Sequence, residues 1–215
     1  WSIVDPTIFS IAIYSKGGNA AGLAFFGFAL IIIARRYEFS AVPLLLWVGV
    51  LLLLISFIWT GHAQKAGPIA QAVLSLHLVA IAFWLGSFLP LRRMCSSPES
   101  ENLYKIAERF GTHAIFYICL LLISGLIFAY ILIGDLSLLL STVYGNVFLM
   151  KITLVSALLG VGAVNKFRLV PSMKLEPSIG AQRLRKSIQI EMVIALLILS
   201  FSGFLTTSTT LPMGG

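Results

Sequence analysis

The sequence predicts an all-α fold, a polytopic bundle of transmembrane helices, and three observations predict it. Hydrophobic residues make up 59% of the 215 residues and charged residues only 11%, whereas a soluble domain has about 45–50% apolar and about 25% charged residues. The mean hydropathy is +0.99. The apolar residues form long unbroken runs, which favour helices over the alternating strands of a membrane β-barrel. These features exclude a soluble enzyme, a disordered chain and a DNA-binding domain.

Six apolar runs are close to the ~20 residues that a helix needs to cross the hydrocarbon core of a bilayer. We expect the spanning helices at residues 18–34, 41–60, 69–91, 112–133, 146–165 and 188–207. Residues 1–16 precede the first run and are expected to be an outer interfacial segment. Because no soluble module lies between the runs, residues 1–215 are predicted to form a single transmembrane domain.

The basic residues predict how the helices are oriented. Twelve of the fifteen lysines and arginines follow the first, third and fifth predicted helices, and the other three, Lys16, Lys65 and Lys151, fall on the opposite side. Cytoplasmic loops of membrane proteins are enriched in such residues. We therefore expect the three basic connections in the cytoplasm and both ends of this chain outside. Lys151 is expected to extend to the outer interface.

Several other partners and chemistries are not indicated. The net charge of +7 does not point to nucleic acid, because the basic residues lie between apolar runs. The connections 92–111 and 166–187 carry no phosphate loop, so no nucleotide is expected. The two cysteines form no CxxC motif. The sequence shows no nucleophile–base pair and no carboxylate pair, so we expect that the chain is not an enzyme.

Two histidines are the first candidates for function. An ionisable side chain at the centre of a membrane helix costs about 2.5–3.5 kcal/mol on insertion scales, so it needs a reason to be there. His77 lies about eight residues into the third predicted helix, and His62 ends the second, across a short outer loop. Imidazole is a ligand of copper, zinc and haem iron. The alternatives are an interfacial polar cap for His62 and an interhelical hydrogen bond for His77.

Five further residues are candidates for a pathway or for support of a metal site. Trp84 shares a helix face with the histidine two turns before it. Glu191, near the cytoplasmic end of the last helix, either pairs with a basic residue or relays a cation or proton. Met94, Cys95 and Met150 are soft donors of the kind that favour Cu(I).

An ordered set of short motifs extends this interpretation. The motifs are Gly61-His62-Ala63, Leu76-His77-Leu78, Phe83-Trp84-Leu85-Gly86, Pro90-Leu91, Arg109-Phe110, Ser124-Gly125, Thr142, Tyr144-Gly145, Lys151, Gly162-Ala163, Asn165-Lys166, Pro171, Leu184-Arg185, Ser187 and Glu191. Together, over about residues 60–207, they resemble the copper resistance protein D family of bacterial inner-membrane proteins. Ser87 and Lys166 depart from it, since Gly and Arg are usual there. Family members look like eight-helix proteins, so these six helices resemble the last six of eight.

The resemblance implies what the chain does. It implies a multi-pass protein of the bacterial inner membrane that carries copper, as Cu(I) or Cu(II), from periplasm to cytoplasm, beside a periplasmic copper-binding partner. His62 is then the entry ligand and His77 the deeper one. Trp84 lines the same face, and Glu191, Met94 and Cys95 mark the inner exit.

Two other functions stay open. A transmembrane haem-binding electron-transfer protein also has intramembrane histidines, but only three are present here, His62, His77 and an interfacial His113. Their unequal depths allow at most one haem. A copper-binding partner or sensor that does not transport needs the same outer copper site, so the sequence does not separate it from a transporter.

Overall fold

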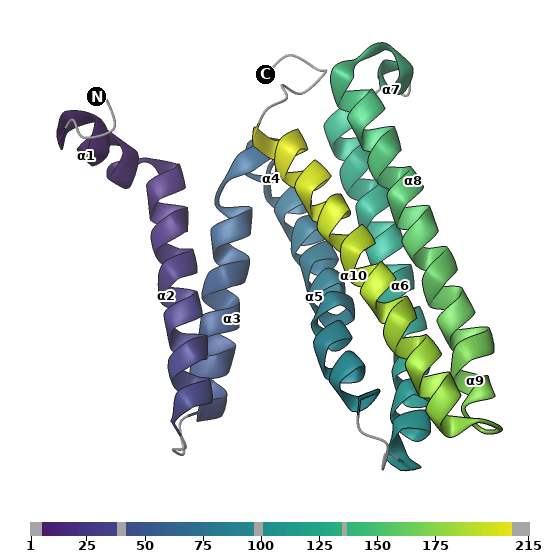
Figure 1. Cartoon of the computed structure of the whole chain (residues 1–215). Helices are drawn as coiled ribbons and strands as arrows, with labels where there is room; N and C mark the ends of the chain where they lie inside the picture. Colours follow the sequence, from purple (N-terminus) through teal and green to yellow (C-terminus); the bar gives the residue numbers. More distant parts are fainter. Residues whose placement is uncertain (1–5, 38–41, 97–100, 135–136, 208–215) are drawn as a thin grey trace. The chain divides into compact units, whose positions relative to one another are not determined.

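The computed structural model describes residues 6–37, 42–96, 101–134 and 137–207. Figure 1 shows that the elements are helices, and the described residues contain no strand. Five helices are long and apolar enough to cross a membrane, and a sixth apolar helix has 17 residues, which is the lower end of the usual range for a membrane span. The predicted all-α, polytopic bundle is therefore confirmed.

The helices follow one another closely along the described chain. Their bounds are α1 Pro6–Tyr14, α2 Lys16–Arg36, α3 Val42–Ile58, α4 Gly61–Ala66, α5 Pro68–Met94, α6 Glu101–Ile133, α7 Leu138–Ser141, α8 Val143–Val164, the π-helical turn η2 Asn165–Leu169, α9 Val170–Ser172 and α10 Pro177–Thr207. The six long apolar helices α2, α3, α5, α6, α8 and α10 correspond in order to the six predicted runs.

The helix ends differ from the prediction in an informative way. The 33 residues of α6 make a helix of about 50 Å, well beyond the ~30 Å hydrocarbon core. The charged segment before its apolar run contains no proline, so nothing ends the helix there. The second predicted helix is shorter than expected. It ends at Ile58, and Gly61 then adopts a positive φ of 74°, a conformation that favours glycine.

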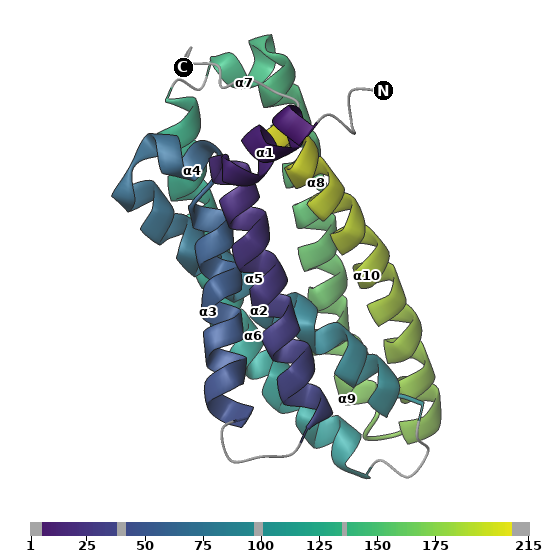
Figure 2. The ribbon, with the colours of Figure 1, turned by 90° about the vertical axis from the view of Figure 1, so that its left-hand side faces the viewer.

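The described chain divides into two compact units, residues 1–75 and 76–215. In the first, α2 and α3 run side by side (Figures 1 and 2). A β-carbon at Gly27 would lie 2.8 Å from the Gly49 carbonyl oxygen, and the reverse distance is also 2.8 Å. The two backbones can approach this closely only because both residues lack a side chain. The N-terminal α1 buries no residue.

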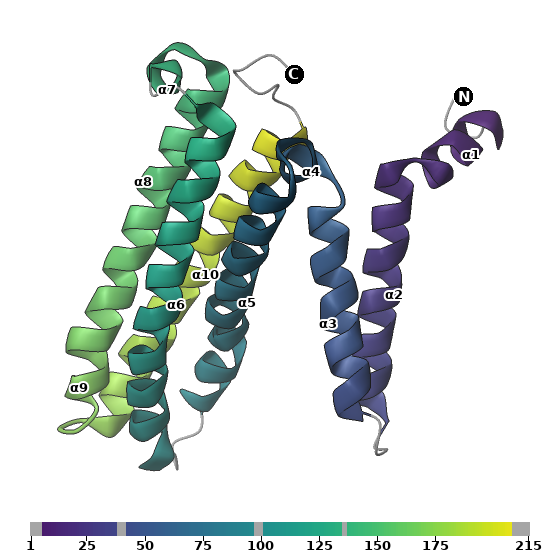
Figure 3. The same ribbon diagram turned by 180° about the vertical axis from the view of Figure 1, so that it is seen from behind.

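The second unit joins α5 from Leu76 onward with α6, α8, α9 and α10, as Figure 3 shows from behind. Its main core is a cluster to which all these helices contribute buried residues, and a smaller cluster is formed by Ile133, Tyr144 and Leu205. Aromatic rings join α5 to α6: Phe83 stacks on Tyr117 with 3.7 Å between ring centroids and on Phe110 at 5.7 Å. This unit holds most of the candidate residues, and the single domain predicted for residues 1–215 stays a prediction.

Large apolar side chains are exposed along the long helices of both units. Phe26, Trp47, Leu126 and Leu196 are each more than half exposed. A water-soluble surface rarely carries so much exposed apolar area, whereas a lipid-facing surface does. With the five spanning helices, this describes a multi-pass membrane protein.

A candidate histidine site and a buried polar cavity

His77 bridges two helices of the second unit. Its Nδ1 lies 3.1 Å from the carbonyl oxygen of Leu121 and 3.2 Å from the hydroxyl oxygen of Ser124, both on α6. A carbonyl oxygen only accepts hydrogen bonds, so Nδ1 carries the proton and donates it. In neutral imidazole this leaves the lone pair on Nε2. Proteins commonly orient a metal-binding histidine in this way: one ring nitrogen donates a hydrogen bond, and the other nitrogen binds the metal.

Small residues on α6 make room for the imidazole ring. A β-carbon at Gly125 would lie 3.0 Å from His77 Cε1 and 3.4 Å from its Nδ1. Ser124 is 3% exposed, and its hydroxyl donates to the Leu120 carbonyl at 2.6 Å. The ring is therefore held by an interhelical hydrogen bond, as one of the two interpretations of His77 expected. This bond also gives the ring the tautomer that metal ligation needs.

A positive charge accompanies the ring. Lys151 of α8 is half-buried, and it is close enough to His77 to interact with it electrostatically. An ammonium group near a half-buried histidine disfavours a second positive charge there.

The other histidines have different surroundings. His62 lies in the short helix α4 and not at the end of α3, and its side chain is outside the described ones. His113 of α6 is exposed, and its Nδ1 lies 2.8 Å from the carbonyl oxygen of Arg109 in the preceding turn. Among the described residues, no three His, Cys, Asp or Glu side chains gather into a group that could hold a metal ion.

A cavity of about 260 Å³ lies among α5, α6, α8, η2 and α10. Aromatic and aliphatic side chains such as Trp84, Phe88 and Ile188 form most of its wall, and its polar side chains in the described chain are Asn165, Lys166 and Glu191. Along α6 the cavity reaches Gly111, ten residues before Leu121, which contacts His77. That spacing corresponds to about 15 Å along the helix axis.

Glu191 is the most deeply placed charged residue of the cavity. It is 4% exposed, and its Oε2 accepts a 2.9 Å hydrogen bond from Asn165 Nδ2. Asn165 is 8% exposed, and its Oδ1 is buried without a hydrogen-bond partner in the described part of the chain. The partner of Glu191 is thus an amide rather than the lysine or arginine that a simple structural role predicts.

The backbone around these two residues is unusual. Asn165 begins the π-helical turn η2, and π-helical turns occur frequently at functional sites. Gly162, one turn earlier, lets the carboxylate approach: a β-carbon there would lie 3.3 Å from Glu191 Oε1 and 3.7 Å from Trp84 Cζ2. Lys166 Nζ donates to the Gly111 carbonyl at 2.7 Å and so joins η2 to α6.

The soft donors are not brought together. Cys95 is buried in the core cluster and Met94 packs against it, while Met150 on α8 is 55% exposed. Burial raises the pKa of the Cys95 thiol, although nearby Arg185 acts in the opposite direction. A raised pKa leaves less of the thiolate that binds metals, so Cys95 is poorly prepared as a ligand.

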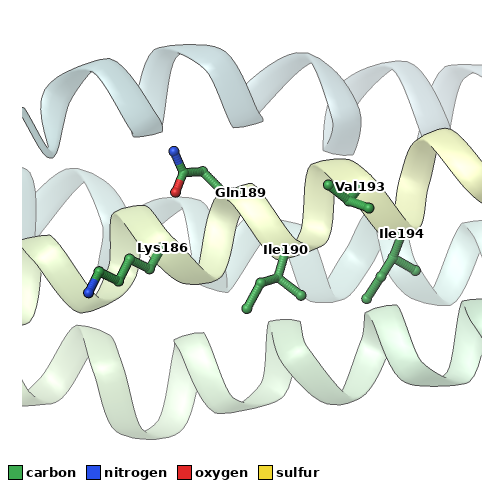
Figure 4. A pocket seen from close by; sticks show the side chains of 5 residues that line it. All are labelled: Lys186, Gln189, Ile190, Val193 and Ile194. Carbon is green, nitrogen blue, oxygen red and sulfur yellow. The ribbon is translucent and has the colours of Figure 1, made fainter.

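A second, shallower pocket lies on α10, and Figure 4 shows its lining residues Lys186, Gln189, Ile190, Val193 and Ile194. None of the predicted site residues lines this pocket, and all five residues that do come from one helix. It therefore adds no candidate chemistry.

The fold converts separate motifs into two clusters. Leu76-His77-Leu78 meets Ser124-Gly125, and Trp84, Phe110, Gly162 and Glu191 line one cavity with Asn165-Lys166. Asn165, Gly162, Ser124 and Gly125 were not predicted as site residues. The signal was weak but present: a small or polar pair interrupts each of two otherwise apolar runs.

Comparisons with known proteins show what the chain is similar to. The model of the family described as Copper resistance protein D matches residues 104–205. The copper transport protein CutJ of Bacillus subtilis (strain 168) is 28% identical over 142 residues, which cover 61% of this chain and 26% of that protein. The chain therefore spans about a quarter of the length of this curated relative. No solved structure matches the chain. These findings support a copper-related membrane function.

Proposed function

Because residues 104–205 match the copper resistance protein D family, which confirms the resemblance predicted from the sequence, we propose that this chain takes part in transporting copper across the bacterial inner membrane. The ion moves from the periplasm to the cytoplasm by exchange between ligands, without nucleotide hydrolysis. A periplasmic copper-binding protein delivers it. The direction is the one that the resemblance to the copper resistance protein D family implies, and the positive-inside rule supports only the cytoplasmic placement of the basic connections.

The observation that supports this proposal most directly is the 3.1 Å contact between His77 Nδ1 and the Leu121 carbonyl oxygen. The Nδ1 atom donates to the Leu121 carbonyl, so the lone pair on Nε2 is available to a metal ion. Imidazole nitrogen binds both Cu(I) and Cu(II). His62 is proposed as a further ligand, nearer the entry. Each histidine is proposed as a copper ligand in its own right, and the proposal does not depend on whether the two share one ion.

The inward path continues along α5. Trp84 follows His77 by seven residues, which is two helical turns and about 10 Å, and it lines the same cavity as Glu191. Copper passing His77 on this helix face would therefore reach the cavity next. Met94, Cys95 and Met150 are proposed as soft donors beside the path.

The test is copper and pigment content of the purified full chain, by elemental analysis and a visible spectrum, followed by copper flux in reconstituted vesicles. The variants are His62→Ala, His77→Ala and both together, with His113→Ala as the matched control because His113 is exposed and bonded only within its own helix. We expect copper to be bound to the wild type and to the control, and to be lost in the variants that replace His62 and His77. Copper retained in the double variant would refute the histidine assignment.

The same experiment decides between the other functions. A haem spectrum that disappears with His77→Ala would favour an electron-transfer protein. Bound copper without flux would favour a copper-binding partner or sensor.

A further inference from the structure

The cavity in the second unit is lined by a carboxylate, Glu191, and by an amide, Asn165, whose oxygen lacks a donor in the described part of the chain. Glu191 accepts one hydrogen bond in the described part of the chain, at Oε2 from Asn165. Its other oxygen, Oε1, faces Gly162 across the contact that the missing β-carbon leaves open. Asn165 Oδ1 is buried with no hydrogen-bond partner among the described residues. A buried acceptor without a donor costs about 1–3 kcal/mol, so this oxygen, beside a buried carboxylate, needs an explanation.

The carboxylate also lacks a cation. Lys166 lines the same cavity, but its Nζ is bonded to the Gly111 carbonyl at 2.7 Å, and no ion pair joins it to Glu191 among the described residues. Glu191 and Lys166 are the titratable residues of the cavity wall there. An unpaired carboxylate in an apolar wall is strongly unfavourable. A positive charge bound at Glu191 would therefore stabilise the folded protein.

The unpaired oxygen of Asn165 distinguishes between the positive charges that could be bound at Glu191. A proton on Glu191 would neutralise the carboxylate but leave Asn165 Oδ1 unpaired in the present amide orientation. A metal cation takes several oxygen ligands, and carboxylate and amide oxygens serve together in such sites. Carboxylate and amide oxygens are hard donors, which suit hard cations, whereas Cu(I) prefers sulfur and nitrogen. One carboxylate balances one positive charge.

We propose that Glu191 and Asn165 form a binding site for an alkali-metal cation, with sodium as the probe. The site joins η2 to α10, and Gly162 provides the space for the carboxylate. The cation neutralises Glu191 and satisfies Asn165 Oδ1. The existence of this site does not rest on copper transport. Its role there, as the ion whose gradient drives copper movement, rests on the proposed function.

The direct test measures binding of radioactive sodium to the purified full chain in copper-free buffer, with choline chloride keeping the ionic strength constant. We expect saturable binding to the wild type. Glu191→Gln and Asn165→Ala should each weaken binding about tenfold or more, because the first removes the negative charge that balances the ion and the second removes the amide oxygen. Glu176→Gln is the matched control, since Glu176 is exposed between α9 and α10 and its loss should change nothing.

Absence of saturable sodium binding to the wild type would overturn the proposal, as would unchanged binding in Glu191→Gln. If that variant does not elute as a folded protein, Asn165→Ala and Asn165→Ser decide in the same way. Because no copper is present, failure here is separate from failure of the copper assignment.

A second measurement uses the wild type alone. Its unfolding midpoint should rise when sodium replaces choline, since a ligand of the folded state stabilises it by mass action. A midpoint that depends on pH but not on sodium would mean that a proton alone neutralises Glu191, and this would overturn the cation site.

Discussion

Gly125 lies so close to His77 that a β-carbon at residue 125 would be 3.0 Å from the imidazole Cε1. The ring lies between its own helix and α6, and its Nδ1 points at the Leu121 carbonyl. The absence of a side chain at Gly125 is thus part of what orients the ring. Any group added there acts on the proposed copper ligand without removing it.

Gly125→Ala should therefore weaken copper binding while leaving His77 in place. Changes to groups that orient a metal ligand typically cost about 10–100-fold in affinity, and we expect a loss in that range. Gly86→Ala is the control, because nothing lies within 4 Å of a β-carbon at that position of α5. The measurement is a copper titration of both purified variants. Equal affinities would show that the ring orientation does not matter for copper.

The helices could be predicted from the sequence because hydropathy is a local property. All six apolar helices were found, but their ends were not, since the charged residues 101–111, which form the start of α6, contain no proline that would stop a helix. The site depends on long-range contacts instead. Ser124 is 47 residues from His77, and Asn165 is 26 residues from Glu191. No periodicity in the sequence reports such pairs, so Glu191 was identified as a candidate without its partner.

Gly162→Ala should disturb the Glu191 carboxylate. The new methyl group would lie 3.3 Å from Oε1 and 3.7 Å from Trp84 Cζ2, so the carboxylate must shift. Gly160→Ala, two residues earlier on α8, meets nothing within 4 Å and should gain up to about 1 kcal/mol of helix propensity. We expect the unfolding midpoint of the first variant to fall below that of the second by about 2–4 °C, the shift for 1 kcal/mol in a domain of this size. A midpoint equal to or above that of Gly160→Ala would show that the carboxylate is not confined.

Gly49→Ala should separate α2 from α3. Its β-carbon would lie 2.8 Å from the Gly27 carbonyl oxygen and 2.7 Å from Ile31 Cγ1, and a backbone atom cannot move aside as a flexible side chain can. Overpacking of this kind costs about 1–3 kcal/mol. Gly22→Ala is the control, with nothing within 4 Å. Thermal unfolding of both purified variants tests the contact, which would be disproved if Gly49→Ala were as stable as the control.

Lys166→Met should loosen the junction between η2 and α6. The Cγ and Cδ atoms of Lys166 lie 3.6 and 3.7 Å from the position that a β-carbon would take at Gly111. Methionine keeps an aliphatic chain there, but it removes the ammonium group that donates to the Gly111 carbonyl. A hydrogen bond to a charged group contributes about 1.5–3 kcal/mol, so the unfolding midpoint should fall by several degrees. Arg168→Met removes an equal charge from an exposed residue of the same turn and should have little effect. Two equal decreases would mean that the loss of charge, and not this hydrogen bond, sets the stability of the junction.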